Sequence, residues 1–265
     1  MATLVSCTAQ VEGLRIAYDA VGRGEPPVVL IHGAFTNRAQ FAAQVEHLAA
    51  AHRVVALDLR GHGDSDVPAE GFSLADFARD VIGVCEVAGI ADGVLCGHSI
   101  GGAVALEVAA TRPDLGAGIV LIDAAILYPE AMRTVQLDRF LPLLEGPRRI
   151  EVLRRFFGAM LGPYDSPDLK TALMAQIAAA PPHMVVPVFR LIAADFAAQL
   201  AAVRQPLLYI HAVAPTDLAR LRVLRPDALV AAVAGSGHYP MLEVPDQVNA
   251  MLDRFLAILA MPRGR

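Results

Sequence analysis

Residues 93–102 read GVLCGHSIGG and join a short apolar run to a longer helical stretch. The pattern Gly-x-Ser-x-Gly is centred on Ser99, with a predicted strand before it and a predicted helix over residues 100–111 after it. This context predicts a turn so tight that a Cβ would clash at both glycines. Such a turn raises the serine hydroxyl above the sheet, at the positive end of the helix. We therefore expect Ser99 to be a nucleophile and the N–H of Ile100 to face an oxyanion. The alternative, a glycine-rich turn with a capping serine, is disfavoured because matching motifs occur elsewhere in the chain.

Short apolar runs alternate with helical stretches on both sides of this motif. Strands are predicted at Val28–Ile31, Val54–Leu57, Gly93–Cys96, Ile119–Ile122, Leu207–Ile210 and Leu229–Ala234. Helices are predicted at Phe41–Ala51, Ser73–Ala88 (with Ser73 as N-cap), Ile100–Thr111 and Gln247–Ala260. The alternation predicts an α/β fold with a mostly parallel sheet and helices on both faces. Sites in such sheets form beyond the carboxyl ends of the strands.

Residues 124–202 break the alternation and contain no convincing strand. Helical segments separated by prolines are predicted at Arg133–Leu144, Arg148–Leu161, Leu169–Ala180 and Val185–Ala202. We predict a core of residues 1–123 and 203–265, with residues 124–202 inserted as a helical lid over Ser99. The side chains expected to line an apolar substrate pocket are Phe156, Phe157 and Met160 from the lid, with Phe35, His98 and Tyr239 from the core.

The composition excludes several classes of protein. The chain has 265 residues, of which 55% are hydrophobic and 18% charged, so a large core is expected rather than disorder. A net charge of −5 disfavours nucleic acid or an anionic membrane surface as partner. Three irregularly spaced cysteines form no disulfide framework, and eight histidines lack metal-ligand spacing. We expect no metal, no cofactor, no signal peptide and no membrane span. We further expect a cytoplasmic protein, a monomer or homodimer, that binds a small-molecule substrate.

Two further segments follow predicted strands. One is His32-Gly33-Ala34-Phe35; the other is GSGHYPMLEVP, which contains His238 and precedes the last helix. With the Ser99 motif, they make the chain resemble the α/β-hydrolase family, in particular serine esterases and lipases with a helical lid. The resemblance spans nearly the whole chain except the insertion. It implies that His238 is the base and that the N–H of Ala34 is the second oxyanion donor.

The same family carries the segment from Asp58 to Ser65 as a turn. Within it, Asp58 and Arg60 are expected to organise loops. His32 and His62 are expected to be structural rather than catalytic.

The acid that would orient His238 is not in its usual place. The family usually supplies it a few residues after the strand at 207–210, but here the loop is short and Pro215 occupies the expected position. Asp217 could reach the histidine if the loop curls, or could cap a helix at 218–224. Asp123, at the end of the strand at 119–122, is the alternative, as in certain haloalkane dehalogenases. We favour Asp123 slightly, with Asp217 as its rival and a Ser-His dyad as a third possibility.

These residues predict a hydrolase that cleaves an ester, thioester or lactone of a small, largely apolar substrate through an acyl-enzyme on Ser99. Cofactor-free dioxygenases, C–C bond hydrolases and perhydrolases share the motifs and form a second hypothesis. A third is a ligand receptor or signalling protein with a slow triad, which the irregular acid loop favours. Ser99 at the nucleophile position excludes an aspartate nucleophile of the epoxide hydrolase or dehalogenase type.

Overall fold

The computed structural model describes residues 3–261, apart from the side chains of Gln136 and Leu137. Within them, one eight-stranded sheet has the order β1-β2-β4-β3-β5-β6-β7-β8. The strands are β1 (Val5–Val11), β2 (Leu14–Val21), β3 (Val28–Ile31), β4 (Val54–Leu57), β5 (Gly93–His98), β6 (Gly116–Ile122), β7 (Leu207–His211) and β8 (Leu229–Ala232). From β4 to β8 every pairing is parallel, whereas β1 and β2 are antiparallel. The predicted α/β fold class is therefore confirmed.

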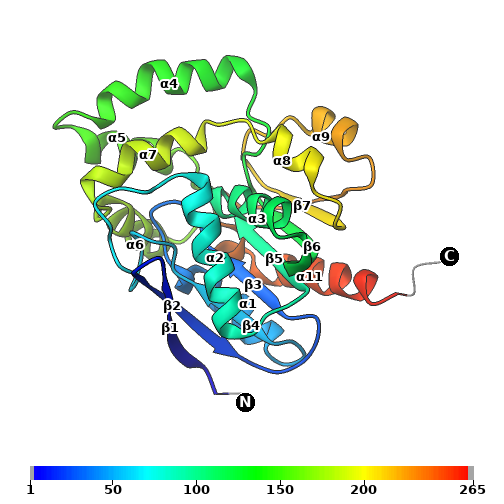
Figure 1. Ribbon diagram of the computed structural model, residues 1–265. Coiled ribbons are helices and arrows are strands. Elements are labelled where there is room, and N and C mark those ends of the chain that lie inside the picture. The colour runs from blue at the N-terminus through cyan, green and yellow to red at the C-terminus, as the bar shows by residue number, and fades with distance from the viewer. Residues whose placement is uncertain (1–2, 262–265) are drawn as a thin grey trace.

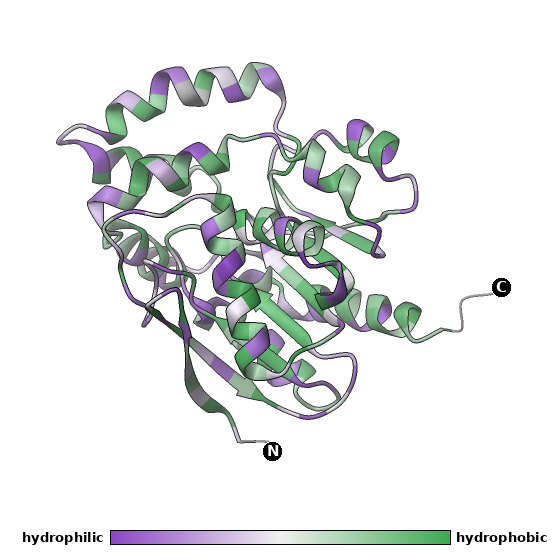
Figure 2. Ribbon diagram, viewed as in Figure 1, coloured by the Kyte–Doolittle hydropathy of each residue, from purple (hydrophilic) through white to green (hydrophobic). Residues whose placement is uncertain are grey.

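The central strands are buried on both faces because their side chains alternate between two hydrophobic clusters. In β3, Val29 and Ile31 pack with the cluster that includes α2 and α3. Val28 and Leu30 pack with the opposite cluster, which includes α1 and α11. Figure 2 shows the result as green strands at the centre, covered by helices whose outer residues include purple ones. Two-sided burial explains why these strands are continuous apolar runs.

Among the helices outside the segment between β6 and β7, the four-residue α10 (Pro240–Glu243) was not predicted, and the others match predicted helices with shifts at their ends. The others are α1 (Ala42–Leu48, after a 3₁₀ turn at Arg38–Phe41), α2 (Leu74–Ala88), α3 (Ile100–Thr111), α9 (Leu218–Leu224) and α11 (Pro245–Leu259). Helix α2 begins with a capping box, in which the Ser73 hydroxyl accepts from Asp76 N and the Asp76 carboxylate accepts from Ser73 N. It ends at Gly89, whose φ of 63° is the left-handed conformation that glycine adopts readily. Local signals of this kind, each worth about 1 kcal/mol, explain why the helix was predictable.

The segment between β6 and β7 is helical, and we call residues 124–202 the helical insertion. It contains α4 (Glu130–Leu144), α5 (Arg149–Gly158), α6 (Pro167–Ala178), α7 (Pro182–Ile192) and α8 (Ala197–Ala202). The prediction of one helix over Val185–Ala202 is wrong. The chain breaks between α7 and α8, where Asp195 caps Ala197 N and pairs with Leu127 in an isolated β-bridge. In Figure 1 the insertion lies over one end of the sheet, with α4 outermost.

The antiparallel hairpin β1–β2 was absent from the predicted elements. Its turn lies at Glu12-Gly13, both with positive φ, and β1 alternates imperfectly between exposed and buried residues.

None of the described helices is alone long and apolar enough to cross a membrane. Helices α6 and α7 meet that test only together, and they bend by 112° at their junction.

Candidate active site

The turn between β5 and α3 places Ser99 in a strained conformation. Its φ is 54° and its ψ is −122°, a combination that costs a residue with a side chain about 1–3 kcal/mol. The glycines on either side make the turn possible. A Cβ on Gly97 would lie 2.1 Å from Gly101 O, and one on Gly101 would lie 2.2 Å from Ile31 O. The backbone thus packs directly against β3, and the strain is concentrated at the serine.

A continuous line of hydrogen bonds joins three side chains from separate loops. His238 Nε2 lies 3.0 Å from Ser99 Oγ, and His238 Nδ1 lies 2.8 Å from Asp123 Oδ2. Because a carboxylate can only accept, Nδ1 carries the hydrogen and Nε2 is left free to accept from the serine hydroxyl. The His238 side chain is 5% exposed and Asp123 is fully buried. The structure therefore brings together Ser99, His238 and Asp123.

His238 and a set of backbone donors together keep Asp123 in its ionised form. Its Oδ1 accepts from three successive amides of the loop after β7, those of Ala212 at 2.7 Å, Val213 at 3.0 Å and Ala214 at 2.9 Å. Burial acts to raise the pKa of Asp123, but the hydrogen bonds and charge of His238 and the loop amides outweigh it and lower the pKa. The loop after β7, which carries the rival candidate Asp217, thus supplies three hydrogen-bond donors to Asp123.

The structure places Asp217 elsewhere. Its carboxylate accepts from Arg220 N at 2.9 Å and caps α9, while its own N–H donates to Leu127 O. Both ring nitrogens of His238 are engaged by Ser99 and Asp123. Of the two aspartates considered, Asp123 contacts the histidine and Asp217 acts as a helix cap.

The loop after β3 passes against the serine. A Cβ on Gly33 would lie 3.2 Å from Ser99 Cβ. Ala34 and Ile100, the two predicted oxyanion donors, are both buried. Phe35 has a φ of 58°, and its N–H donates to His62 Nε2 at 3.0 Å. The conformation of this loop is thus set partly by a histidine 27 residues further along the chain.

Two buried histidines connect these loops through the backbone. His32 Nδ1 donates to Gly33 O and its Nε2 accepts from Leu59 N; His62 Nδ1 donates to Arg60 O. These bonds require neutral rings. Burial lowers the pKa of His32 to about 4 and that of His62 to about 3.

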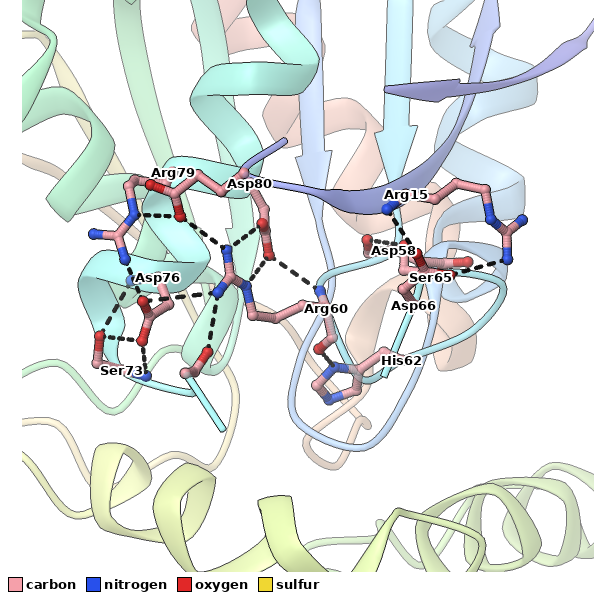
Figure 3. A network of polar contacts seen from close by, with 12 residues as sticks. Arg15, Asp58, Arg60, His62, Ser65, Asp66, Ser73, Asp76, Arg79 and Asp80 are labelled. Carbon is pink, nitrogen blue, oxygen red and sulfur yellow. Dashed lines mark hydrogen bonds and ion pairs between the residues drawn. The ribbon is translucent and has the colours of Figure 1, made fainter. Parts of the chain in front are cut away.

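An ion-pair network holds the segment after β4, which contains Asp58, Arg60 and His62 (Figure 3). Arg60 donates two hydrogen bonds to the Asp80 carboxylate, at 2.7 and 2.8 Å, and a third to Gly71 O. Asp58 accepts from Arg38 and from Asp64 N. These charged residues join the loops around the site without reaching Ser99.

The cavity at Ser99 is lined by residues other than those predicted. A small cavity touches the serine, and the rest of its lining is Ile100, Ala103, Ala125, Ile126, Leu191, Ile192 and Phe196. None of the six side chains predicted to line the pocket is among them. The signal that could have found these residues is their position, since Ala125 and Ile126 directly follow Asp123.

The six predicted residues have other surroundings. His98 and Tyr239 are 1% exposed and pack against the His238 ring, with centroids 4.7 and 5.2 Å away. His98 Nε2 donates to His238 O at 2.7 Å, so this ring supports the histidine from behind. Phe35, Phe156 and Phe157 form an aromatic cluster, with centroid separations of 5.7 Å for Phe35–Phe157 and 5.1 Å for Phe156–Phe157. Met160 accepts from His238 N through its carbonyl.

In residues 3–261, no cluster of three or more His, Cys, Asp or Glu side chains could hold a metal ion. The cysteines of that region are free, and burial raises the pKa of Cys85 and Cys96 to about 12.

Residues 28–251 match the sequence profile of the Alpha/beta hydrolase family. The chain therefore belongs to the α/β hydrolase family. It is 27% identical to the AB hydrolase superfamily protein YisY of Bacillus subtilis (strain 168), over 92% of this chain and 96% of that protein. A 2-(acetamidomethylene)succinate hydrolase of Mesorhizobium japonicum is also 27% identical, over 85% of this chain and 86% of that protein. A solved structure of a thermophilic esterase from Thermogutta terrifontis superposes with a TM-score of 0.83 at 23% identity, covering 97% of this chain and 100% of the esterase chain.

Proposed function

We propose that this chain is a serine hydrolase that cleaves an ester, thioester or lactone bond of a small, largely apolar substrate. The observation that carries the proposal is the hydrogen-bonded line from Asp123 Oδ2 through His238 to Ser99 Oγ, with separations of 2.8 and 3.0 Å. A histidine held in one tautomer, with its free nitrogen on a strained serine, is the arrangement that makes a hydroxyl nucleophilic.

In the proposed reaction, Ser99 Oγ attacks the carbonyl carbon while its proton passes to His238 Nε2. The carbonyl electron pair moves onto oxygen, and the N–H groups of Ala34 and Ile100 hold the resulting oxyanion. Asp123 stabilises the imidazolium. When the intermediate collapses, the leaving alkoxide or thiolate takes the proton from His238, and an acyl-enzyme remains. Water then attacks with His238 as base, which releases the carboxylic acid and restores Ser99.

The lining of the cavity supports an apolar substrate. Apart from Ser99, its residues are aliphatic or aromatic, and no Arg or Lys is among them. Ala125, Ile126, Leu191, Ile192 and Phe196 all belong to the helical insertion. We propose that the insertion acts as a lid that covers Ser99 and selects the acyl group by shape. The small cavity favours a short acyl chain.

The proposal is tested with p-nitrophenyl acetate and p-nitrophenyl butyrate, together with labelling by a fluorophosphonate probe followed by mass spectrometry. We expect turnover of at least one ester, and label on the peptide that contains Ser99. Ser99→Ala should abolish both. Labelling without ester turnover would favour C–C bond hydrolysis over ester cleavage. Absence of both turnover and labelling would refute a serine hydrolase.

A further inference from the structure

The loop that carries His238 is held by the helical insertion through direct backbone contacts. His238 N donates to Met160 O at 2.8 Å. Gly162 and Gly237 pack backbone against backbone: a Cβ on Gly237 would lie 2.4 Å from Gly162 N, and a Cβ on Gly162 would lie 2.8 Å from Gly237 N. The insertion thus reaches the proposed base as well as the cavity. We therefore expect the position of residues 160–162 to influence where the His238 ring lies.

Two carboxyl groups face each other across this contact. Asp165 belongs to the insertion and is 8% exposed; its Oδ2 accepts from Gly162 N at 2.6 Å. Glu243 ends α10, and its Oε2 accepts from Ser236 Oγ at 2.5 Å and from Gly237 N. A Cβ on Gly162 would lie 2.8 Å from both Asp165 Oδ1 and Gly237 N, and that same Gly237 N donates to Glu243, so both carboxyl groups lie at this contact. Each group therefore holds a different side of the contact between the insertion and the histidine loop.

The remaining oxygens of these carboxyl groups lack an ordinary donor. Asp165 Oδ1 and Glu243 Oε1 are both buried, and neither accepts a hydrogen bond from any described residue. Two adjacent carboxylates would repel each other and leave both oxygens unsatisfied. One proton between them satisfies both, because a protonated carboxyl donates a strong hydrogen bond to a carboxylate.

We propose that Asp165 and Glu243 share one proton, and that this carboxyl pair positions His238 by joining the insertion to the Ser236–His238 loop. The role as a positioning device rests on the proposed function, since it acts through the proposed base. Neither carboxyl contacts Ser99 or the cavity lining. Glu243 and Asp165 are therefore positioning residues.

The surroundings of Glu243 favour its protonated form. Burial raises the pKa of Glu243, as does the neighbouring Asp165, while the hydrogen bonds from Ser236 and Gly237 lower it; the net direction is upward. Tyr239, directly before α10, is also close to Glu243. Burial raises the pKa of Tyr239, and the Glu243 charge raises it further. Loss of the shared proton as the pH rises would place two anions side by side and push the two loops apart.

The first experiment compares isosteric and truncated variants. Glu243→Gln keeps an acceptor for Ser236 and Gly237 and donates its amide to Asp165, and Asp165→Asn offers the reciprocal arrangement. Both should retain kcat within about threefold, whereas Glu243→Ala and Asp165→Ala should lower kcat roughly tenfold to a hundredfold with little change in KM. Fluorophosphonate labelling of Ser99 should slow in parallel. Glu70→Ala, which removes an exposed carboxyl, is the matched control. Equal losses in Glu243→Gln and Glu243→Ala would overturn the shared proton.

The second experiment does not require catalysis. In a Ser99→Ala background, hydrogen exchange at the amides of Gly237 and His238 is measured from pH 4 to pH 9. We expect these two amides to lose protection once the carboxyl pair releases its shared proton, beyond the intrinsic rise in exchange rate with pH. With Glu243→Gln added, that extra loss should disappear. An identical pH dependence with and without Glu243→Gln would refute the pair, whether or not the wild-type chain hydrolyses esters.

Discussion

Three buried histidines, His238 on one side of the comparison and His32 and His62 on the other, follow the carboxyl ends of strands, and their partners give them different chemistry. His238 bonds to a carboxylate and a hydroxyl, so its protonated form has a countercharge and its free nitrogen has a reactive neighbour. His32 and His62 bond only to backbone groups, donating from Nδ1 and accepting at Nε2. Burial lowers the pKa values of these two rings to about 4 and about 3. The comparison shows that side-chain partners, and not burial, separate a proposed base from a structural histidine.

The largest expected effect comes from the serine that His238 faces. Ser99→Ala should lower kcat by at least about 10⁴-fold, because the acyl-enzyme can no longer form. Ester turnover and covalent labelling measure the loss. The folded state should persist, as judged by an unchanged circular dichroism spectrum. Residual turnover within tenfold of wild type would mean that His238 serves another nucleophile.

Replacing Asp123, the carboxylate that faces His238, should lower kcat nearly as much. In Asp123→Asn, the three amides of residues 212–214 still need an acceptor, so the new side chain must turn its NH₂ toward His238 Nδ1. That places the ring hydrogen on Nε2, where it cannot accept from Ser99. We expect kcat to fall by about 10³–10⁴-fold. Asp217→Asn is the matched control, since that carboxylate caps α9. A mild effect of Asp123→Asn would support a Ser-His dyad.

The structural histidines should respond mainly in stability. His62→Ala leaves Phe35 N and Arg60 O without their buried partner, which should cost about 1–3 kcal/mol of unfolding free energy for the unsatisfied donor. Denaturant titration measures this loss. His183→Ala, at an exposed histidine, should change the free energy by less than about 0.5 kcal/mol. If His62→Ala abolished labelling of Ser99 at unchanged stability, the division between the two groups would be wrong.

Acid should destabilise the folded chain through the two structural histidines, His32 and His62. The pKa values of His32 and His62 are lower in the folded chain, about 4 and 3, than the ordinary 6.5. The unfolded chain therefore binds more protons below pH 6.5, and stability falls as the pH drops from there toward 4. At pH 5 each histidine should cost up to about 2 kcal/mol relative to pH 7.5. Denaturant titrations at both values test this, and His62→Ala should show a smaller pH dependence than wild type.

Local steric and capping requirements made much of the fold predictable. The strands at Val28–Ile31 and Val54–Leu57 are fully buried, so their apolar runs match the observed limits. The Ser99 turn was visible because only glycine fits where backbone atoms would meet a Cβ at 2.1 and 2.2 Å. The β1–β2 hairpin was missed because β1 has only two buried residues and no clear apolar run.

Features that depend on long-range packing were not predictable. The choice between Asp123 and Asp217 depends on three amides 89–91 residues away from Asp123, which the local sequence does not reveal. The cavity lining depends on how α7 and the segment after it pack over Ser99, and this placed Leu191 and Phe196 at the site instead of Phe156 and Phe157. Periodicity identifies that a helix has an apolar face but not which partner that face contacts.

The smallest expected effect concerns the rejected acid. Asp217→Ala removes the cap of α9, whose carboxylate accepts from Arg220 N at 2.9 Å, and should lower the unfolding free energy by about 1 kcal/mol. Asn also caps helices well, so Asp217→Asn should restore most of this loss. Neither change should alter kcat by more than about twofold, because His238 Nδ1 keeps its bond to Asp123. Thermal unfolding and ester turnover, measured on the same samples, test both statements. A kcat for Asp217→Ala as low as that of Asp123→Asn would show that the α9 cap moves to the histidine during the reaction.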